Sequence, residues 1–308
     1  MMEKEKAARR ADRLSFLLSL TAFILILSFP AASSEGVRSG LSLCYRAVVP
    51  SVFPSLILTD LLFSRPCKAI EKTVGRMFHL LFHTSPRGAV AWVAGLLSGF
   101  PVGAITVARD VERGALSREE GEYLLAFVNN TGPAFLVGGI GLGLFGSARL
   151  GWALYFLQIP VSLFVGFLLR PKARAVSPPA TLESTAVAAP VSAIVRASEK
   201  TVRIAGFVCF FSVLSSLLSL FLPDGLSLAL ASSILEVGCG AARASRLAAP
   251  FPALPLVAFS VCFSGLSVHF QTLSVLDGTG IRTKSYRRGK TVSGFLGLFF
   301  SLFFCLTN

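Results

Sequence analysis

The chain contains few side chains suited to chemistry, and most of them lie inside apolar segments. Glu236 stands near the middle of the apolar run 226–244. A carboxylate inside a membrane segment costs about 2.5–3.5 kcal/mol on insertion scales, so such a residue usually marks a transport pathway or an ion-coupling site. The alternative is a structural role, in which Glu236 partners Arg243, Arg246 or a helix end.

A second group of polar side chains interrupts another apolar run. Asn129, Asn130 and Thr131 are followed by Gly132 and Pro133, where regular helical hydrogen bonding should stop. A broken helix exposes unpaired N–H groups and the positive end of a helix dipole, and both favour an anion. The alternative is a kink whose polar groups form hydrogen bonds between helices.

The other candidates are polar residues near further breaks or at the ends of spans. As substrate-binding groups we expect Ser98, His269, Gln271 and Thr272, in addition to Asn129, Asn130 and Thr131. As ion-coupling groups we expect Glu236 and Asp60. Asp60 lies close to the end of the run 44–63, so simple solvation of its carboxylate is the alternative.

Motifs of known enzymes and metal sites are absent from the sequence. It has no HExxH motif, no grouping of Cys, His and Asp, and no pair of carboxylates in one span. Its six cysteines form no CxxC pair, so neither a disulfide framework nor a metal site is indicated. We therefore expect no enzymatic activity and no resident cofactor, although a proton or a sodium ion could couple to the function.

The composition indicates a membrane protein. Of 308 residues, 53% are hydrophobic and only 15% are charged, with a mean hydropathy of +0.71, whereas an average soluble domain has about 25% charged residues. The 29 Lys and Arg residues outnumber the 16 Asp and Glu residues, but they lie in short stretches between apolar runs. That pattern is typical of cytoplasmic loops and argues against nucleic-acid binding. We predict an all-α, polytopic helix bundle whose first partner is the lipid bilayer.

The apolar runs divide the chain into four regions. Residues 1–33 hold a first span, which we expect to be retained, although a cleaved signal peptide is the alternative. Residues 44–170 form a first transmembrane half with breaks near 98–103 and 129–133. Residues 171–203 form a cytoplasmic linker, and residues 204–308 form a second half with Glu236 and a break near 264–269.

The positive charges also constrain the topology. If every run were a full crossing, the stretch 170–203, with its six basic residues, would lie outside the cell. Treating the broken runs 89–108 and 251–276 as re-entrant hairpins instead places every strongly basic linker on the cytoplasmic side. We therefore predict two hairpins at these positions.

The two halves show weak internal similarity. At an offset of 166, Ser98-Gly99 matches Ser264-Gly265, and Thr106 matches Thr272. Interrupted hydrophobic segments at corresponding positions of two halves are the best sequence indication of a transporter's binding site.

The broken segments also carry a family resemblance. The motifs are SGFPVGA (98–104) and NNTGP (129–133) in the first half, and LEV (235–237) and SGLSVHFQ (264–271) in the second. They resemble the YlbJ-type sporulation integral membrane proteins, which belong to the wider nucleoside-recognition, or Gate, group. The resemblance implies a multi-pass protein of the outer forespore membrane that moves dipicolinic acid toward the spore. One departure is Gly238-Cys239-Gly240, which stands where a polar pair is expected after the glutamate.

These observations lead to one expected function and several alternatives. We expect a permease for a small organic anion, most simply dipicolinic acid, in which Glu236 is protonated or bound to a cation. The likeness of the wider group to concentrative nucleoside transporters makes a nucleoside the competing substrate. A third possibility is a non-transporting organiser or gate subunit in a homo- or hetero-oligomer, where Asn129, Asn130 and Glu236 would contact another subunit.

Overall fold

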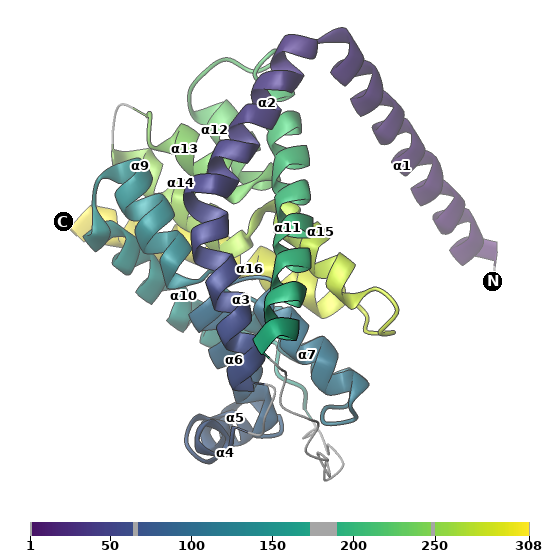
Figure 1. Cartoon of the computed structure of the whole chain (residues 1–308), viewed down its shortest axis with the longest axis vertical. Coiled ribbons are helices and arrows are strands. Elements are labelled where there is room, and N and C mark those ends of the chain that lie inside the picture. Colours follow the sequence, from purple (N-terminus) through teal and green to yellow (C-terminus); the bar gives the residue numbers. More distant parts are fainter. Residues whose placement is uncertain (1, 64–66, 173–189, 248–249, 308) are drawn as a thin grey trace.

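A computed structural model describes residues 2–63, 67–172, 190–247 and 250–307. This part of the chain is all-α, with helices joined by short loops (Figure 1). Four helical segments are long and apolar enough to cross a membrane: Pro30–Phe63, Ala148–Leu168, Pro190–Leu218 and Ala253–Leu276. The expected all-α membrane bundle is confirmed.

The helices form two successive sets. The first set contains α2 (Pro30–Leu43), η1 (Cys44–Val48), α3 (Val49–Phe63), α4 (Lys68–Lys72), α5 (Val74–Phe82), α6 (Arg87–Ser98), α7 (Val102–Glu112), α8 (Arg118–Val128), η2 (Ala134–Leu142), α9 (Gly143–Phe145) and α10 (Ala148–Leu168). The second set contains α11 (Pro190–Leu218), α12 (Leu226–Leu235), α13 (Val237–Ala244), α14 (Pro250–Phe263), α15 (Gly265–Leu276) and α16 (Lys284–Thr307). Helix α1 (Met2–Ser28) precedes both sets.

Two pairs of short helices fold back as hairpins. In the first hairpin (α6–α7), Arg87 at the start of α6 forms an ion pair with Asp110 near the end of α7. In the second hairpin (α12–α13), Asp224 just before α12 lies 3.7 Å from Arg243 in the last turn of α13. Each pair joins the two outer ends of its hairpin. The first hairpin lies in the lower part of Figure 1 and the second in the upper part, so their tips approach each other from opposite ends.

The run 251–276 is a broken helix that continues in one direction, so the hairpin predicted there is wrong. Helix α16 lies alongside both of its parts: Gly297 contacts Cys262 in α14, and Tyr286 contacts Thr272 in α15. At the break, Ser264 and Gly265 adopt positive φ values of 78° and 59°, which bend the chain without reversing it. The reversal occurs instead at Glu236.

The two halves therefore share one order of elements: a long helix, a hairpin, a broken helix and a further helix. In this order α6–α7 corresponds to α12–α13, and α8–η2 corresponds to α14–α15. The tip at Ser98-Gly99 is thus equivalent to the region of Glu236, and Gly132 is equivalent to Gly265. The alignment at an offset of 166 is therefore wrong, because it pairs a hairpin tip (Ser98-Gly99) with a helix break (Ser264-Gly265). The two segments resemble each other because both kinds of interruption use small residues.

Several boundaries differ from the sequence expectation. The second span begins at Pro30 rather than at 44, since α2, η1 and α3 are continuous. Residues 190–203 of the expected linker belong to α11, whereas residues 173–189 lie outside the described part of the chain. Helix α1 extends away from the bundle in Figure 1, and its apolar side chains, such as Leu18 at 62%, are exposed.

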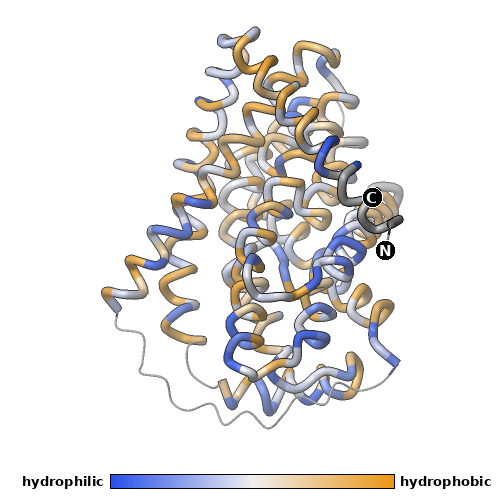
Figure 2. The backbone as a smooth tube through the Cα atoms, turned by 90° about the vertical axis from the view of Figure 1, so that its right-hand side faces the viewer, coloured by the Kyte–Doolittle hydropathy of each residue, from blue (hydrophilic) through white to orange (hydrophobic). Residues whose placement is uncertain are grey.

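The charges are unevenly distributed between the two ends of the bundle. The connections at the end that holds α4 and α5 contain most of the loop Lys and Arg residues, and hydrophilic residues gather at this lower end in Figure 2. At the opposite end, the connections 146–147 and 219–225 contain no Lys or Arg, and 245–249 contains only Arg246. With the second hairpin at α12–α13 rather than at 251–276, most of the basic connections still lie at one end of the bundle.

Candidate functional site

A small cavity lies where the two halves meet. Both hairpin tips, the break between α8 and η2, and helix α15 contribute to its wall, together with α3 and α11. Its polar lining consists of hydroxyl, amide and carboxylate side chains: Ser51, Ser55, Ser98, Thr131, Glu236 and Gln271. Its apolar lining includes Val52, Leu97, Phe100, Phe135, Ile204, Val208 and Val268.

The first hairpin tip packs directly on the break between α8 and η2, called here the first break (residues 129–133). A Cβ atom on Gly99 would lie 2.7 Å from the backbone nitrogen of Gly132, so the two backbones are in contact. Gly99 has φ 83° and ψ −178°, a conformation essentially restricted to glycine. The neighbouring Ser98 hydroxyl is hydrogen-bonded to Thr59 on α3. Glycine at position 99 is thus required both by the close approach of the two backbones and by its own backbone conformation.

The second hairpin tip makes the equivalent contact with the break between α14 and α15, called here the second break (Ser264). A Cβ atom on Gly265 would lie 3.3 Å from the Cα atom of Glu236. Glu236 has an extended backbone and forms the N-cap of α13, where its Oε2 accepts a hydrogen bond from the Cys239 N–H at 2.7 Å. Its side chain is nearly buried but lines the cavity. Glu236 therefore caps a helix end and also faces the candidate site.

Gln158 on α10 satisfies backbone groups that the first break leaves without helical partners. The Thr131 N–H donates to Gln158 Oε1 at 2.9 Å, and Gln158 Nε2 donates to the Thr131 carbonyl at 2.6 Å. The Thr131 hydroxyl in turn donates to the Val261 carbonyl, just before the second break. These bonds hold the irregular backbone in shape and connect the two breaks.

Four helices begin next to residues that line the cavity, so the positive ends of their dipoles lie near it. They are α7 and α13 of the hairpins, and η2 and α15 after the two breaks. Of these, α7, η2 and α15 have no side-chain cap, whereas α13 is capped by the Glu236 carboxylate. Uncapped helix N-termini present N–H donors and the positive end of the dipole, which suits an anion. At the fourth N-terminus, that of α13, the Glu236 carboxylate already occupies the position where an anion is favoured.

The residues expected from the sequence to bind substrate fall into two groups. Ser98, Thr131 and Gln271 line the cavity. The other four lie behind its wall: Asn129 Nδ2 donates to Thr272 Oγ1 at 3.0 Å, Asn130 Nδ2 donates to the Phe127 carbonyl, and a His269 ring nitrogen contacts the Phe263 carbonyl. They stabilise the breaks on which the cavity depends.

Of the two expected ion-coupling residues, Asp60 lies apart from the others. Its carboxylate forms hydrogen bonds of 2.6 and 2.9 Å with Arg196, which ties α3 to α11. Asp60 is not part of the cavity lining, whereas Glu236 is. The structure therefore brings Glu236, but not Asp60, together with the candidate binding groups.

A known protein is similar in sequence to this chain over nearly its whole length. It is the sporulation integral membrane protein YlbJ of Bacillus subtilis (strain 168), with 28% identity over 326 residues, covering 91% of this chain and 79% of YlbJ. The chain is thus similar to an integral membrane protein of sporulation. No family model and no solved structure matches it. Because only 9% of the chain lies outside the similarity to YlbJ, both halves and the cavity between them fall within it.

Two further residues near the cavity, Gln158 and Lys290, were not among the expected site residues. Gln158 is an amide inside the apolar run 150–169, which is a signal that could have identified it. Lys290 follows four other basic residues, at 282, 284, 287 and 288, and this pattern predicts a solvated loop. In the structure it is buried within α16, and its amine donates to the Asn129 carbonyl at 2.7 Å.

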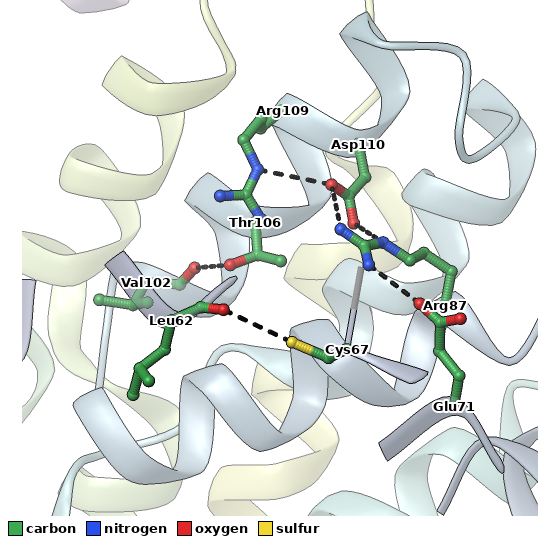
Figure 3. A network of polar contacts seen from close by, with 8 residues as sticks. All are labelled: Leu62, Cys67, Glu71, Arg87, Val102, Thr106, Arg109 and Asp110. Carbon is green, nitrogen blue, oxygen red and sulfur yellow. Dashed lines mark hydrogen bonds and ion pairs between the residues drawn. The ribbon is translucent and has the colours of Figure 1, made fainter. Parts of the chain in front are cut away.

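A charged cluster holds the base of the first hairpin (Figure 3). The fully buried Asp110 accepts hydrogen bonds of 2.9 and 3.3 Å from Arg87 and a longer one from Arg109. Arg87 also binds Glu71 on α4 at 3.0 Å. Burial alone would lower the pKa of Arg87, but Asp110 and Glu71 more than offset it and the pKa is raised. The guanidinium thus stays charged and fixes the hairpin base to α4.

Proposed function

We propose that this protein is a multi-pass transporter for a small organic anion, and that its substrate is dipicolinic acid moved across the outer forespore membrane during sporulation. The observation that carries the proposal is the cavity formed jointly by the two hairpin tips and by residues of the two broken helices. The match to a sporulation membrane protein supports the cellular setting. The bound solute would contact both halves of the molecule.

The arrangement of the halves supports transport. Hairpins that enter from opposite ends and meet at a central cavity are the product of an inverted repeat, and in transporters such repeats form the substrate site near the bilayer midplane. Either hairpin could open the cavity toward its own end. The polar groups of the lining are hydroxyls, an amide and a single carboxylate, which is a set for binding rather than for bond cleavage.

The character of the cavity supports an anionic, partly aromatic solute. Three uncapped helix N-termini supply donors for carboxylates. Gln271 adds an amide whose Oε1 atom is buried without a hydrogen-bond partner in the described structure. Phe100 and Phe135 supply apolar surface for a ring. The cavity holds only about 30 Å³ of free space in this structure, so one of the hairpins would have to open to admit a solute.

Glu236 supplies the proposed coupling. A carboxylate in the cavity would repel a dianion such as dipicolinate unless it were protonated or bound to a cation. We infer that Glu236 couples solute movement to a proton or a sodium ion, or takes part in binding a calcium chelate of the solute. Its hydrogen bond to the Cys239 N–H would then have to change during the cycle.

The distribution of basic residues supports one orientation. The end of the bundle with α4, α5 and the connections 113–117, 169–172 and 277–283 is proposed to face the cytoplasm, because Lys and Arg are enriched in cytoplasmic loops. The first hairpin then opens from the cytoplasmic side and the second from the opposite side.

Uptake of labelled dipicolinate into proteoliposomes tests the proposal. We expect saturable uptake that Gln271→Ala reduces at least tenfold and that Ser198→Ala, an exposed position on α11, leaves unchanged. Uptake of uridine in place of dipicolinate would move the protein to the nucleoside class. If folded protein transported neither solute, the transporter proposal would be refuted in favour of an organiser or gate subunit.

A further inference from the structure

Lys290 is a buried cation with no acidic partner among the residues that the structure describes. It is 3% exposed, and its Nζ donates to the Asn129 carbonyl at 2.7 Å. No carboxylate of the described residues lies within ion-pair distance of it. Burying an ion costs several kcal/mol unless it is well compensated. A residue of this kind inside a membrane bundle is a functional candidate by default.

The hydrogen bond alone does not explain the charge. Gln158 satisfies the Thr131 carbonyl at the same break with a neutral amide. A glutamine or asparagine on α16 could serve the Asn129 carbonyl in the same way without the cost of burying an ion. What distinguishes Lys290 is therefore its positive charge.

The surroundings of Lys290 suit a cation. Asn129 is the residue at which α8 ends, so its carbonyl belongs to the negative end of the helix dipole. The Asn129 Oδ1 atom is buried and has no hydrogen-bond partner in the described structure. Thr272 Oγ1 is bonded to the same asparagine side chain at 3.0 Å. Carbonyl and hydroxyl oxygens are the ligands that hard cations prefer.

Broken-helix transporters use such positions for a coupling ion. Unwound backbone carbonyls and the C-terminal ends of half-helices coordinate sodium ions or protons in these folds. Here the carbonyl at the end of α8 receives an ammonium group from α16 instead. We propose that Lys290 is a tethered cation that takes the place of a coupling metal ion at the first break. The inference rests on the proposed transport function and specifies its ion requirement.

One consequence concerns ion dependence. A tethered ammonium stays with the protein throughout the cycle, so no sodium ion is needed at the end of α8. Removing the ammonium should leave a cation-sized vacancy beside the Asn129 carbonyl oxygen. A small free cation should then occupy this vacancy.

The test is chemical rescue of Lys290→Ala by small cations. The readout is the thermal unfolding of the purified full-length protein in detergent. We expect a lower Tm than for the wild type in choline chloride. Sodium, ammonium or methylammonium chloride at the same ionic strength should restore at least half of the loss. The matched control is Lys284→Ala, an exposed lysine at the start of the same helix, whose Tm should not depend on the cation.

Other outcomes would overturn the inference. If no small cation raised the Tm of Lys290→Ala above its value in choline, the vacancy would not be a cation site. If Lys290→Ala failed to fold, Lys290→Gln, which keeps a hydrogen-bond donor, would be used in the uptake assay. A rate at least tenfold below that of the wild type is expected, and wild-type uptake would show that the charge is dispensable.

The two readouts separate this inference from the proposed function. Rescue of the Tm does not require that any solute be transported, so it tests the cation site even if wild-type protein carries neither dipicolinate nor uridine. Conversely, sodium-independent dipicolinate uptake without rescue of Lys290→Ala would support the transporter and refute the tethered cation.

Discussion

The contact between Gly99 and Gly132 gives the sharpest test of how the first hairpin meets the first break. We expect Gly99→Ala to destabilise the protein strongly and to abolish uptake. The methyl group would lie 2.7 Å from the backbone nitrogen of Gly132, where no flexible side chain can move aside. It would also be attached to a residue with φ 83° and ψ −178°, which is unfavourable for alanine.

Two terms contribute to the expected magnitude. The backbone conformation costs about 1–3 kcal/mol for a residue other than glycine. Inserting a methyl group into a closely packed contact typically costs a further 1–3 kcal/mol or so. The total of about 2–6 kcal/mol corresponds to a change of about 30-fold or more in the equilibrium between folded and unfolded protein, at about 1.4 kcal/mol for each factor of ten.

Gly114→Ala is the matched control. Gly114 also has a positive φ, 68°, but nothing lies within 4 Å of an added Cβ atom. Gly114→Ala should therefore incur only the cost of the backbone conformation, without the packing cost, and should retain uptake. Thermal unfolding in detergent gives the stability of each variant, and uptake into proteoliposomes gives its activity. If Gly99→Ala were as stable and active as Gly114→Ala, the close approach of tip and break would not be required.

Three further changes test other parts of the structure. Asp110→Asn should cost about 3–5 kcal/mol because it leaves Arg87 buried without its carboxylate; a Tm equal to that of Asp224→Asn, at the exposed base of the second hairpin, would contradict this. Glu236→Gln should change the dependence of uptake on pH or on cations, and an unchanged dependence would argue against a coupling role. Asp60→Asn should lower the Tm by releasing Arg196 while leaving that dependence as in the wild type, and an altered dependence would restore Asp60 as a coupling residue.

Much of the fold follows from the sequence because lipid imposes strict requirements on it. Long apolar runs, basic linkers and the interruptions at Gly99 and Gly132 identify membrane helices and their breaks. The direction of the chain after an interruption is set by contacts between distant segments. Ser264-Gly265 resembles Ser98-Gly99 in sequence, but the first bends a crossing helix and the second forms a hairpin tip. In the structure Gly265 packs against the second hairpin tip at Glu236, whereas Gly99 packs against the break at Gly132.

The candidate site was accessible to sequence reasoning where polar residues interrupt apolar runs. Glu236, Thr131 and Gln271 were found in this way and line the cavity. Lys290 was hidden because a lysine in a basic stretch reads as solvated, and only the burial of the first turns of α16 reveals its position. Whether a polar residue faces the cavity or lies behind its wall depends on the rotation of its helix, as Gln271 and Thr272 illustrate.

The two hairpins differ in how firmly their bases are held, and this bears on how the cavity opens. Asp110 at the base of the first hairpin is fully buried and binds Arg87 at 2.9 Å, whereas Asp224 at the base of the second is 96% exposed and lies 3.7 Å from Arg243. Buried, hydrogen-bonded pairs are costly to break, while exposed pairs contribute little. The second hairpin can therefore move with less loss of interaction at its base. It also carries Glu236 at its tip, so a change in the charge of Glu236 would act on the more loosely held of the two hairpins. In the proposed transporter, ion coupling and opening would thus reside in the same element.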